Sequence, residues 1–236
     1  MKVLALDLGE KRVGYAMADA DVGIVNRTGV IQLSALVAFL KENPAELVLV
    51  GMPVSLSGRF SGAVERTIRQ IKKRVAPFVE KIAMIDERYT SRLVERTQLN
   101  GVPRNRKHKG YVDAMSAYVL LEGYLQGVPK LWWYEKDLHF DRLKLAPGFS
   151  RILVWDIPVI VESEDDSSEV YYLSTHPQIF VELRRLGKKV FNREEDLKEH
   201  SPFDLVICEE VPKTDLVFKE VIVPGAGLHT RKGSQS

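Results

Sequence analysis

The sequence predicts an α/β protein, with a mixed sheet flanked by helices in its first half and a second, smaller α/β domain after it. Short apolar runs of strand length alternate with longer stretches of helical length over residues 1–128. The earliest runs are close enough to pair as hairpins, whereas later ones are separated by helices. This combination is typical of a sheet with both antiparallel and parallel strands.

Charge also divides the chain. Residues 1–128 contain 19 Lys and Arg against 13 Asp and Glu, whereas residues 129–236 contain 15 against 19. A basic first half and an acidic second half indicate two units with different partners. The basic excess is compatible with a nucleic-acid partner.

Composition excludes several classes of protein. The single cysteine, Cys208, rules out an intrachain disulfide and a cysteine-based zinc site. No apolar run approaches the roughly 18–20 residues that span a bilayer, and the first residues do not resemble a signal peptide. We therefore expect a cytoplasmic protein with no membrane partner.

The elements of the first half follow from these runs and from the residues that interrupt them. The segment Gly9–Arg12 joins the first two runs as a hairpin, Ser34 is the expected N-cap of the first helix, and Gly101 with Pro103 ends a later one. We predict five strands, over residues 3–8, 13–18, 25–33, 47–50 and 82–85. We predict helices over residues 34–43, from the end of the loop 57–62 to about 75, and over 90–100 and 111–125.

The second half reads as a small α/β unit after Pro129. Its aromatic run Trp132–Tyr134 is expected to be a packing anchor or a seam between units. We predict strands over 152–155, 159–161, 170–173, 189–191 and 205–208, and helices over 177–186 and 194–199. The predicted domains are therefore residues 1–128 and 130–228, followed by a polar tail over 229–236 that is expected to be disordered.

Three acidic positions stand at the ends of apolar elements. Asp7 follows the run 3–6, the pair Asp86-Glu87 follows the run 82–85, and Asp113 lies near the start of the last helix. A carboxylate in such a place loses hydration unless a cation compensates it. Oxygen ligands suit Mg²⁺, so a divalent-metal site is the first hypothesis.

Each acid also has a plainer interpretation. Asp7 precedes Gly9 and could be a turn residue, although its alternation with Val3 and Ala5 predicts that it faces the core side. Asp86 and Glu87 could both serve a following helix N-terminus, and Asp113 could be an acid of a first helical turn. Adjacent strand residues point to opposite faces, so we favour Glu87 as the ligand, with Asp86 in a supporting role behind it or paired with Arg88.

Basic residues and one loop are candidates for contact with phosphates. The loop Gly51–Gly58 follows a buried strand and could cradle a phosphate with its N–H groups, or be a plain connection. Cations recur at helical spacing after it and cluster again over residues 104–109, where His108 is either a proton shuttle or simply exposed. A solvated surface is the alternative to a nucleic-acid track. The candidate nucleic-acid contacts are Lys11, Arg12, Arg59, Arg66, Arg69, Lys73, Arg88, Arg104, Arg106, Lys107 and Lys109.

Four segments together resemble the YqgF/RuvX family of Holliday-junction-resolvase-like nucleases. They are Ala5–Gly14, the loop from Val50 to Arg59, Asp86–Ser91 and Asp113–Ala117, in this order. The third segment has Tyr89-Thr90-Ser91 where the family more often has Leu-Thr-Thr, and the fourth has Ser116 where it usually has Ala. The resemblance covers residues 1–127 and does not extend to residues 130–236.

The resemblance implies an RNase H-like fold and a phosphodiester-cleaving activity that uses Mg²⁺ or Mn²⁺. Asp7 would bridge two metal ions, flanked by Glu87 and Asp113, in a two-metal endonuclease. The family's association with maturation of the 16S ribosomal RNA 5′ end makes RNA a substrate candidate beside branched DNA. The alternative is a nucleic-acid-binding protein with little or no catalysis, and residues 130–228 could provide a homodimer or protein-docking surface.

Overall fold

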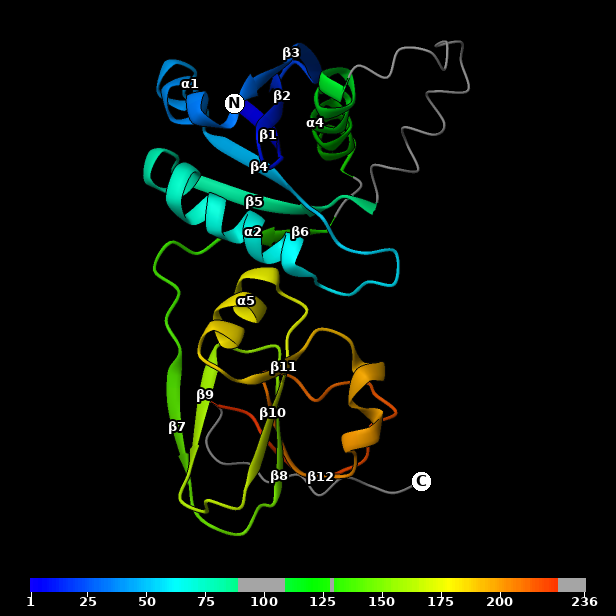
Figure 1. Cartoon of the computed structure of the whole chain (residues 1–236). Helices are drawn as coiled ribbons and strands as arrows, with labels where there is room; N and C mark the ends of the chain where they lie inside the picture. The colour runs from blue at the N-terminus through cyan, green and yellow to red at the C-terminus, as the bar shows by residue number, and fades with distance from the viewer. Residues whose placement is uncertain (89–108, 128–129, 225–236) are drawn as a thin grey trace. The chain divides into compact units, whose positions relative to one another are not determined.

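The computed structural model describes residues 1–88, 109–127 and 130–224, with the side chains of 109–111 left out (Figure 1). The predicted helix 90–100, most of the basic loop 104–109 and the tail 229–236 lie outside the described residues. The chain divides into two compact units, Met1–Lys136 and Asp137–Ser236. Each unit is described by itself.

The first unit is built on a six-stranded mixed sheet. Its strand order is β3-β2-β1-β4-β5-β6, in which β1 pairs antiparallel with β2, β2 with β3 and β5 with β6, while β1, β4 and β5 run parallel. The strands are β1 (Lys2–Leu8), β2 (Arg12–Asp19), β3 (Ile24–Gln32), β4 (Leu47–Met52), β5 (Lys81–Asp86) and β6 (Leu131–Trp133). The five predicted strands and the mixed sheet flanked by helices are confirmed.

The sixth strand was not predicted. The aromatic run contributes β6, which closes the edge of the sheet by pairing Ile85 with Leu131 and Ala83 with Trp133. A three-residue strand next to Pro129 is too short to be recognised from its own pattern. It covers backbone groups that would otherwise form a free edge of β5.

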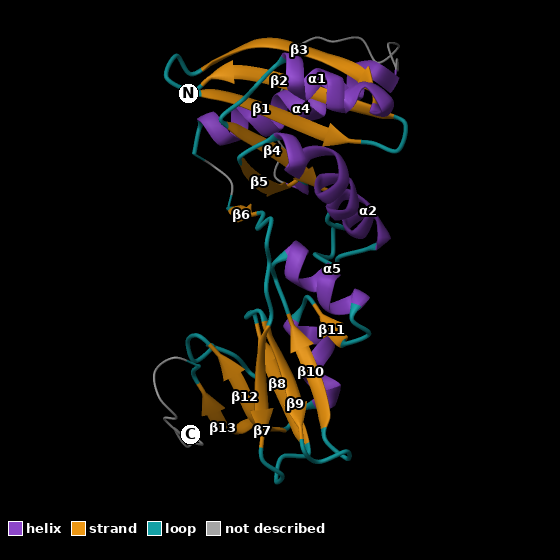
Figure 2. Cartoon of the chain, turned by 90° about the vertical axis from the view of Figure 1, so that its left-hand side faces the viewer, coloured by secondary structure: helices purple, strands orange, loops and turns teal. Residues whose placement is uncertain are grey.

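Helices cover both faces of this sheet (Figure 2). One face packs against α4 (Lys109–Leu125) through small and branched side chains such as Ala5, Ala16, Leu49 and Leu120. On the other face, Tyr15 packs against Phe39 of α1 (Leu36–Glu42), with ring centroids 4.6 Å apart. The small residues on the α4 face allow this helix to lie close to the sheet.

The N-termini of α1 and α2 are formed in different ways, and the first differs from the prediction. The predicted N-cap at Ser34 is wrong, because a 3₁₀ turn over Leu33–Ala35 precedes α1 and its N-cap is Ala35, without a side-chain bond. By contrast, Ser61 caps α2 (Gly62–Gln70) by accepting a 3.2 Å hydrogen bond from the N–H of Ala63. A π-helical turn over Ile71–Val75 then continues α2.

The second unit contains a five-stranded parallel sheet of order β11-β10-β8-β12-β13 and a separate parallel pair, β7 and β9. Its elements are β7 (Asp141–Leu145), β8 (Arg151–Trp155), β9 (Val159–Ser163), β10 (Glu169–Leu173), α5 (Pro177–Arg185), β11 (Lys189–Phe191), a 3₁₀ helix over Glu194–His200, β12 (Phe203–Cys208) and β13 (Phe218–Ile222). The five predicted strands form. β7 and β13 were missed because charged residues interrupt their apolar pattern.

No helix in the described part of either unit is long and apolar enough to cross a membrane.

Candidate acidic site at the sheet edge

Asp7 lies near the carboxyl end of β1, on the face that α4 covers. It continues the alternation of Val3 and Ala5, both of which belong to the core beneath α4. On the neighbouring strand its partner in the ladder is Gly14. The predicted core-facing orientation of Asp7 is therefore seen, and its carboxylate stands where apolar packing ends.

Gly14 brings α4 into contact with the sheet beside Asp7. A Cβ atom at this position would lie 1.8 Å from the carbonyl oxygen of Asp113, so a larger residue would collide with the helix backbone. Only glycine permits this approach. Asp113 thereby comes close enough for its negative charge to raise the pKa of Asp7.

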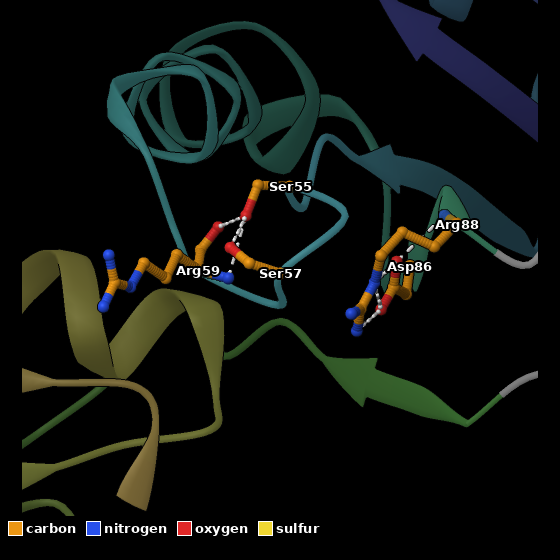
Figure 3. Close-up of polar contacts among 5 residues, drawn as sticks. All are labelled: Ser55, Ser57, Arg59, Asp86 and Arg88. Carbon is orange, nitrogen blue, oxygen red and sulfur yellow. Dashed lines mark hydrogen bonds and ion pairs between the residues drawn. The ribbon is translucent and has the colours of Figure 1, made fainter. Parts of the chain in front are cut away.

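Asp86 and Glu87 have separate environments at the end of β5. Asp86 is buried, and its carboxylate accepts from Nε of Arg88 at 2.9 Å, from Nη2 at 2.6 Å and from the Arg88 backbone N–H at 2.9 Å (Figure 3). Glu87 points to the other face, where a Cβ on Gly51 would lie 2.5 Å from its Oε1. Asp86 is thus held by Arg88, while the carboxylate of Glu87 lies on the face that α4 and Asp7 share.

The acids raise one another's affinity for protons. Burial, followed by the charge of Asp113, raises the pKa of Asp7 to about 6. Burial, followed by the charges of Asp7 and Asp86, raises the pKa of Glu87 to about 7. Such mutual repulsion at a desolvated edge is what a bound cation would relieve.

Two neighbours partly offset this repulsion. The Ser116 side chain donates a hydrogen bond to Asp7 that lowers its pKa, although burial and Asp113 outweigh it. The Nη2 atom of Arg12 lies 3.1 Å from Oδ2 of Asp113, with both side chains about one-third exposed. Sequence reasoning assigned neither contact, since both depend on α4 crossing β2.

The three acids have the right chemistry to bind a hard cation, but their side chains are not arranged around a common point. Their donors are all carboxylate oxygens, the ligands that Mg²⁺ and Mn²⁺ prefer. Within residues 1–88, 109–127 and 130–224, however, no three acidic, histidine or cysteine side chains converge on one point. One oxygen of Asp113, Oδ2, is paired with Arg12 instead, so a cation at Asp113 would compete with this guanidinium.

The loop after β4 is a closed turn. Four of its N–H groups donate within the chain: Val54 to Met52 O, Ser55 to Arg59 O, Gly58 to Ser55 O and Arg59 to Ser55 Oγ. These four groups are therefore not free to cradle a phosphate, which favours the plainer interpretation of Gly51–Gly58.

Some of the predicted phosphate contacts gather at the same edge as Asp7. The β1–β2 turn carries exposed Lys11, and α2 lies against this turn because Gln70 Nε2 donates to Gly9 O and Arg66 pairs with Glu10 at 3.5 Å. Arg59, Arg69 and Lys73 are exposed. Arg104, Arg106, Lys107 and His108 lie outside the described residues, and so does the side chain of Lys109.

Two glycines that the acidic site requires escaped the sequence reasoning. Gly14 and Gly51 permit the close approach of Asp113 and Glu87 respectively. An isolated glycine within a strand is a signal of close backbone approach or a bulge. Gly14, inside the run 13–18, showed that signal.

Comparison with known proteins places residues 1–127 in one family. They match the model described as "RuvX: Holliday junction resolvase". A protein of Azobacteroides pseudotrichonymphae is 34% identical over 137 residues, 55% of this chain and 99% of the relative. Proteins of Bacteroides fragilis and Thermus thermophilus are each 30% identical, over 53% of this chain and 96% and 97% of the relatives. All three bear the name "Putative pre-16S rRNA nuclease".

The solved structures that match include two chains of Thermus thermophilus RuvC. One is the protein itself, with a TM-score of 0.35, and the other is its complex with a Holliday junction substrate, with a TM-score of 0.34. Each is 13% identical and covers 56% of this chain and 99% of its own.

Proposed function

The chain belongs to the RuvX family of Holliday junction resolvases, and from this we propose that it is a metal-dependent endonuclease acting on structured nucleic acid. The observation that supports this most is the raised pKa of two neighbouring carboxylic acids at the edge of the sheet. Asp7 and Glu87 both hold protons more tightly than ordinary acids do, because they are desolvated beside other carboxylates. A site that must be filled by a divalent cation has this character.

We propose Asp7, Glu87 and Asp113 as the ligands of Mg²⁺ or Mn²⁺. A bound cation would neutralise the carboxylates and polarise the scissile phosphodiester. Asp7 interacts with both of the other acids: the charge of Asp113 raises the pKa of Asp7, and the charge of Asp7 raises the pKa of Glu87. Asp86 supports the site indirectly, because with Arg88 it fixes the end of β5 from which Glu87 projects.

A two-metal mechanism is the finer form of this proposal. Asp7, Glu87 and Asp113 would together hold the two ions, which would activate a water and stabilise the leaving oxygen of the phosphodiester. The protein would supply two further contributions. Exposed basic residues such as Lys11 would orient the phosphate backbone, and α4 would keep water from one side of the acids.

The substrates we propose are precursor 16S ribosomal RNA near its 5′ end and four-way DNA junctions. The relatives' name suggests the first, and the family description suggests the second. The test incubates the full-length chain with both substrates, with and without Mg²⁺ or Mn²⁺. Cleavage that requires the metal and disappears in Asp7→Asn supports the proposal, whereas equal cleavage by Asp7→Asn would overturn the assigned site.

A nucleic-acid-binding protein without catalysis is the second candidate. Two observations favour it: Arg12 already neutralises Asp113, and no three acidic, histidine or cysteine side chains among the described residues are placed to hold a metal. This candidate predicts salt-dependent binding that is unchanged in Asp7→Asn, with no metal-dependent turnover of either substrate.

A further inference from the structure

One large apolar side chain stands out on the surface of the first unit. Leu56 is 94% exposed, whereas the other exposed large apolar residues of the described ranges reach at most 65%. A single exposed leucine is ordinary on a protein surface. Its meaning depends on the turn that presents it and on what surrounds that turn.

The turn that presents Leu56 is fixed by an internal network of hydrogen bonds. Gly58 N donates to Ser55 O at 2.8 Å, which places Leu56 at the first corner of a tight turn. The Ser55 hydroxyl lies 2.9 Å from Arg59 N, 3.0 Å from Arg59 O and 3.0 Å from the Ser57 hydroxyl. Gly58 adopts φ +83°, a conformation that glycine accepts without strain. The leucine is therefore held out in water by a preorganised support.

This turn stands beside Arg88, at the end of β5 from which Glu87 also projects. It follows β4 directly, and the last residue of that strand, Met52, pairs with Asp86. A Cβ atom on Gly58 would lie 3.3 Å from Nη1 of Arg88, whose guanidinium binds Asp86. Figure 3 shows the Ser55–Arg59 turn next to the Asp86–Arg88 pair. The exposed leucine thus lies at the end of the sheet where the proposed function puts the scissile phosphate.

We propose that Leu56 is a wedge that contacts the bases of the nucleic-acid substrate where their stacking is interrupted. This inference rests on the proposed function and names the kind of substrate the site selects. Apolar side chains that enter base steps partly unstack them. A continuous duplex resists such entry, whereas a branch point, bulge or duplex end has already lost that stacking. Leu56 therefore favours branched or interrupted structures over continuous duplex.

The surroundings of the turn favour nucleic acid as the occupant. Exposed Arg59 closes the same turn, and exposed Lys11 and Arg66 lie on the edge that Asp7 shares. Cations of this kind attract phosphates without reading sequence. An apolar tip next to Arg59, at the same end of the sheet as these other cations, suits a ligand with stacked apolar bases and a charged backbone.

The test compares binding by Leu56→Ala and by a matched control, Ile24→Ala. Ile24 is also exposed and apolar, but it pairs with Asp19 at the end of the sheet remote from Asp7. All variants are made in the Asp7→Asn background, so that the proposed chemistry cannot consume the probe. Fluorescence anisotropy then measures affinity for a four-way junction and for a continuous duplex of the same sequence. A 2-aminopurine base at the branch reports unstacking.

Leu56→Ala is expected to weaken junction binding about tenfold, the scale of losing one buried leucine contact. Duplex binding and thermal unfolding should not change, and the 2-aminopurine signal on junction binding should fall. Leu56→Met should restore preference and signal, and Ile24→Ala should match its parent. Equal junction binding by Leu56→Ala, or an equal loss for duplex and junction, overturns the wedge.

These outcomes are separate from those that test catalysis. If the wild type cleaves neither substrate with any metal, yet Leu56→Ala loses junction preference, the nuclease proposal fails and the wedge remains. If cleavage depends on metal and on Asp7 while Leu56→Ala binds like its parent, the wedge fails and the nuclease proposal remains.

Discussion

The Nη2 atom of Arg12 lies 3.1 Å from Oδ2 of Asp113, so a side chain of the β1–β2 hairpin neutralises an acid of α4. Sequence reasoning placed Arg12 among phosphate contacts and Asp113 among metal ligands. The ion pair means that metal binding at Asp113 and phosphate binding at Arg12 depend on each other. A divalent cation at Asp113 would compete with the guanidinium, which on release could bind a phosphate.

Arg12→Ala should therefore tighten binding of Mn²⁺ a few-fold and weaken binding of nucleic acid. The free energy of unfolding should change by less than about 1 kcal/mol, because partly exposed ion pairs contribute little. Isothermal titration with Mn²⁺ and anisotropy with a junction measure the two effects. Arg66→Ala, which breaks the exposed pair with Glu10, is the control and should leave Mn²⁺ binding unchanged. Weaker Mn²⁺ binding by Arg12→Ala would instead mean that Arg12 positions Asp113 for the metal.

Gly14→Ala should destabilise the first unit, because its Cβ would lie 1.8 Å from the Asp113 carbonyl oxygen and the helix backbone must move. We expect a loss of about 1–3 kcal/mol or more in urea unfolding, together with a loss of metal-dependent activity. Gly123→Ala on the same helix meets nothing within 4 Å and should stabilise by up to about 1 kcal/mol. A neutral Gly14→Ala would show that α4 does not pack on β2 as described.

Gly51→Ala should damage the site more than the fold. Its Cβ would lie 2.5 Å from Glu87 Oε1 and 2.9 Å from Leu120 Cδ1, which are both ends of side chains that can rotate. We expect an unfolding loss of no more than about 1–2 kcal/mol. Mn²⁺ binding should fall about tenfold, because Glu87 is pushed aside. Unchanged Mn²⁺ affinity would argue against Glu87 as a ligand.

The sequence was sufficient for five of the six strands of the sheet and for Asp7 and Glu87 facing α4, because both follow from alternation along an apolar strand. Val3, Ala5 and Asp7 share a face, as do Ala83, Ile85 and Glu87, and Asp86 faces the other way. Local pattern and tertiary burial agree here, so the inference needed no long-range information.

Contacts between distant elements could not be predicted in the same way. Arg12 meets Asp113 and Ser116 meets Asp7 only because α4 crosses the sheet at Gly14. The start of α1 was misplaced for a related reason: Ser34 is a good cap by type, but the chain enters the helix through a 3₁₀ turn.

In the metal-free protein, the contribution of Glu87 to the free energy of unfolding should decrease as the pH rises from about 4 to about 7. Burial raises the pKa of Glu87 to about 7, above its ordinary value, so over this window the folded state binds more protons than the unfolded state. Glu87→Gln removes this group. Its unfolding free energy relative to wild type should therefore increase with pH, by up to about 3 kcal/mol, and level off above pH 7. Urea unfolding in a chelator at several pH values measures it, with exposed Glu80→Gln as the control. A difference that does not vary with pH contradicts the raised pKa.

The boundary of the first unit can be tested by truncation, because β6 lies beyond the domain limit expected from the sequence. Residues 1–136 retain Leu131–Trp133 on the edge of β5, whereas residues 1–128 leave that edge unpaired. An unpaired edge promotes association between chains, so we expect 1–128 to aggregate and to unfold at a lower temperature than 1–136. Light scattering and thermal unfolding distinguish the two, and equal behaviour would mean that β6 is dispensable.

The same truncation tests the second unit as a homodimer surface. If the full chain is a dimer and 1–136 is a monomer that binds junctions equally well, the second unit provides the homodimer surface. If both chains have the same oligomeric state, that proposal fails.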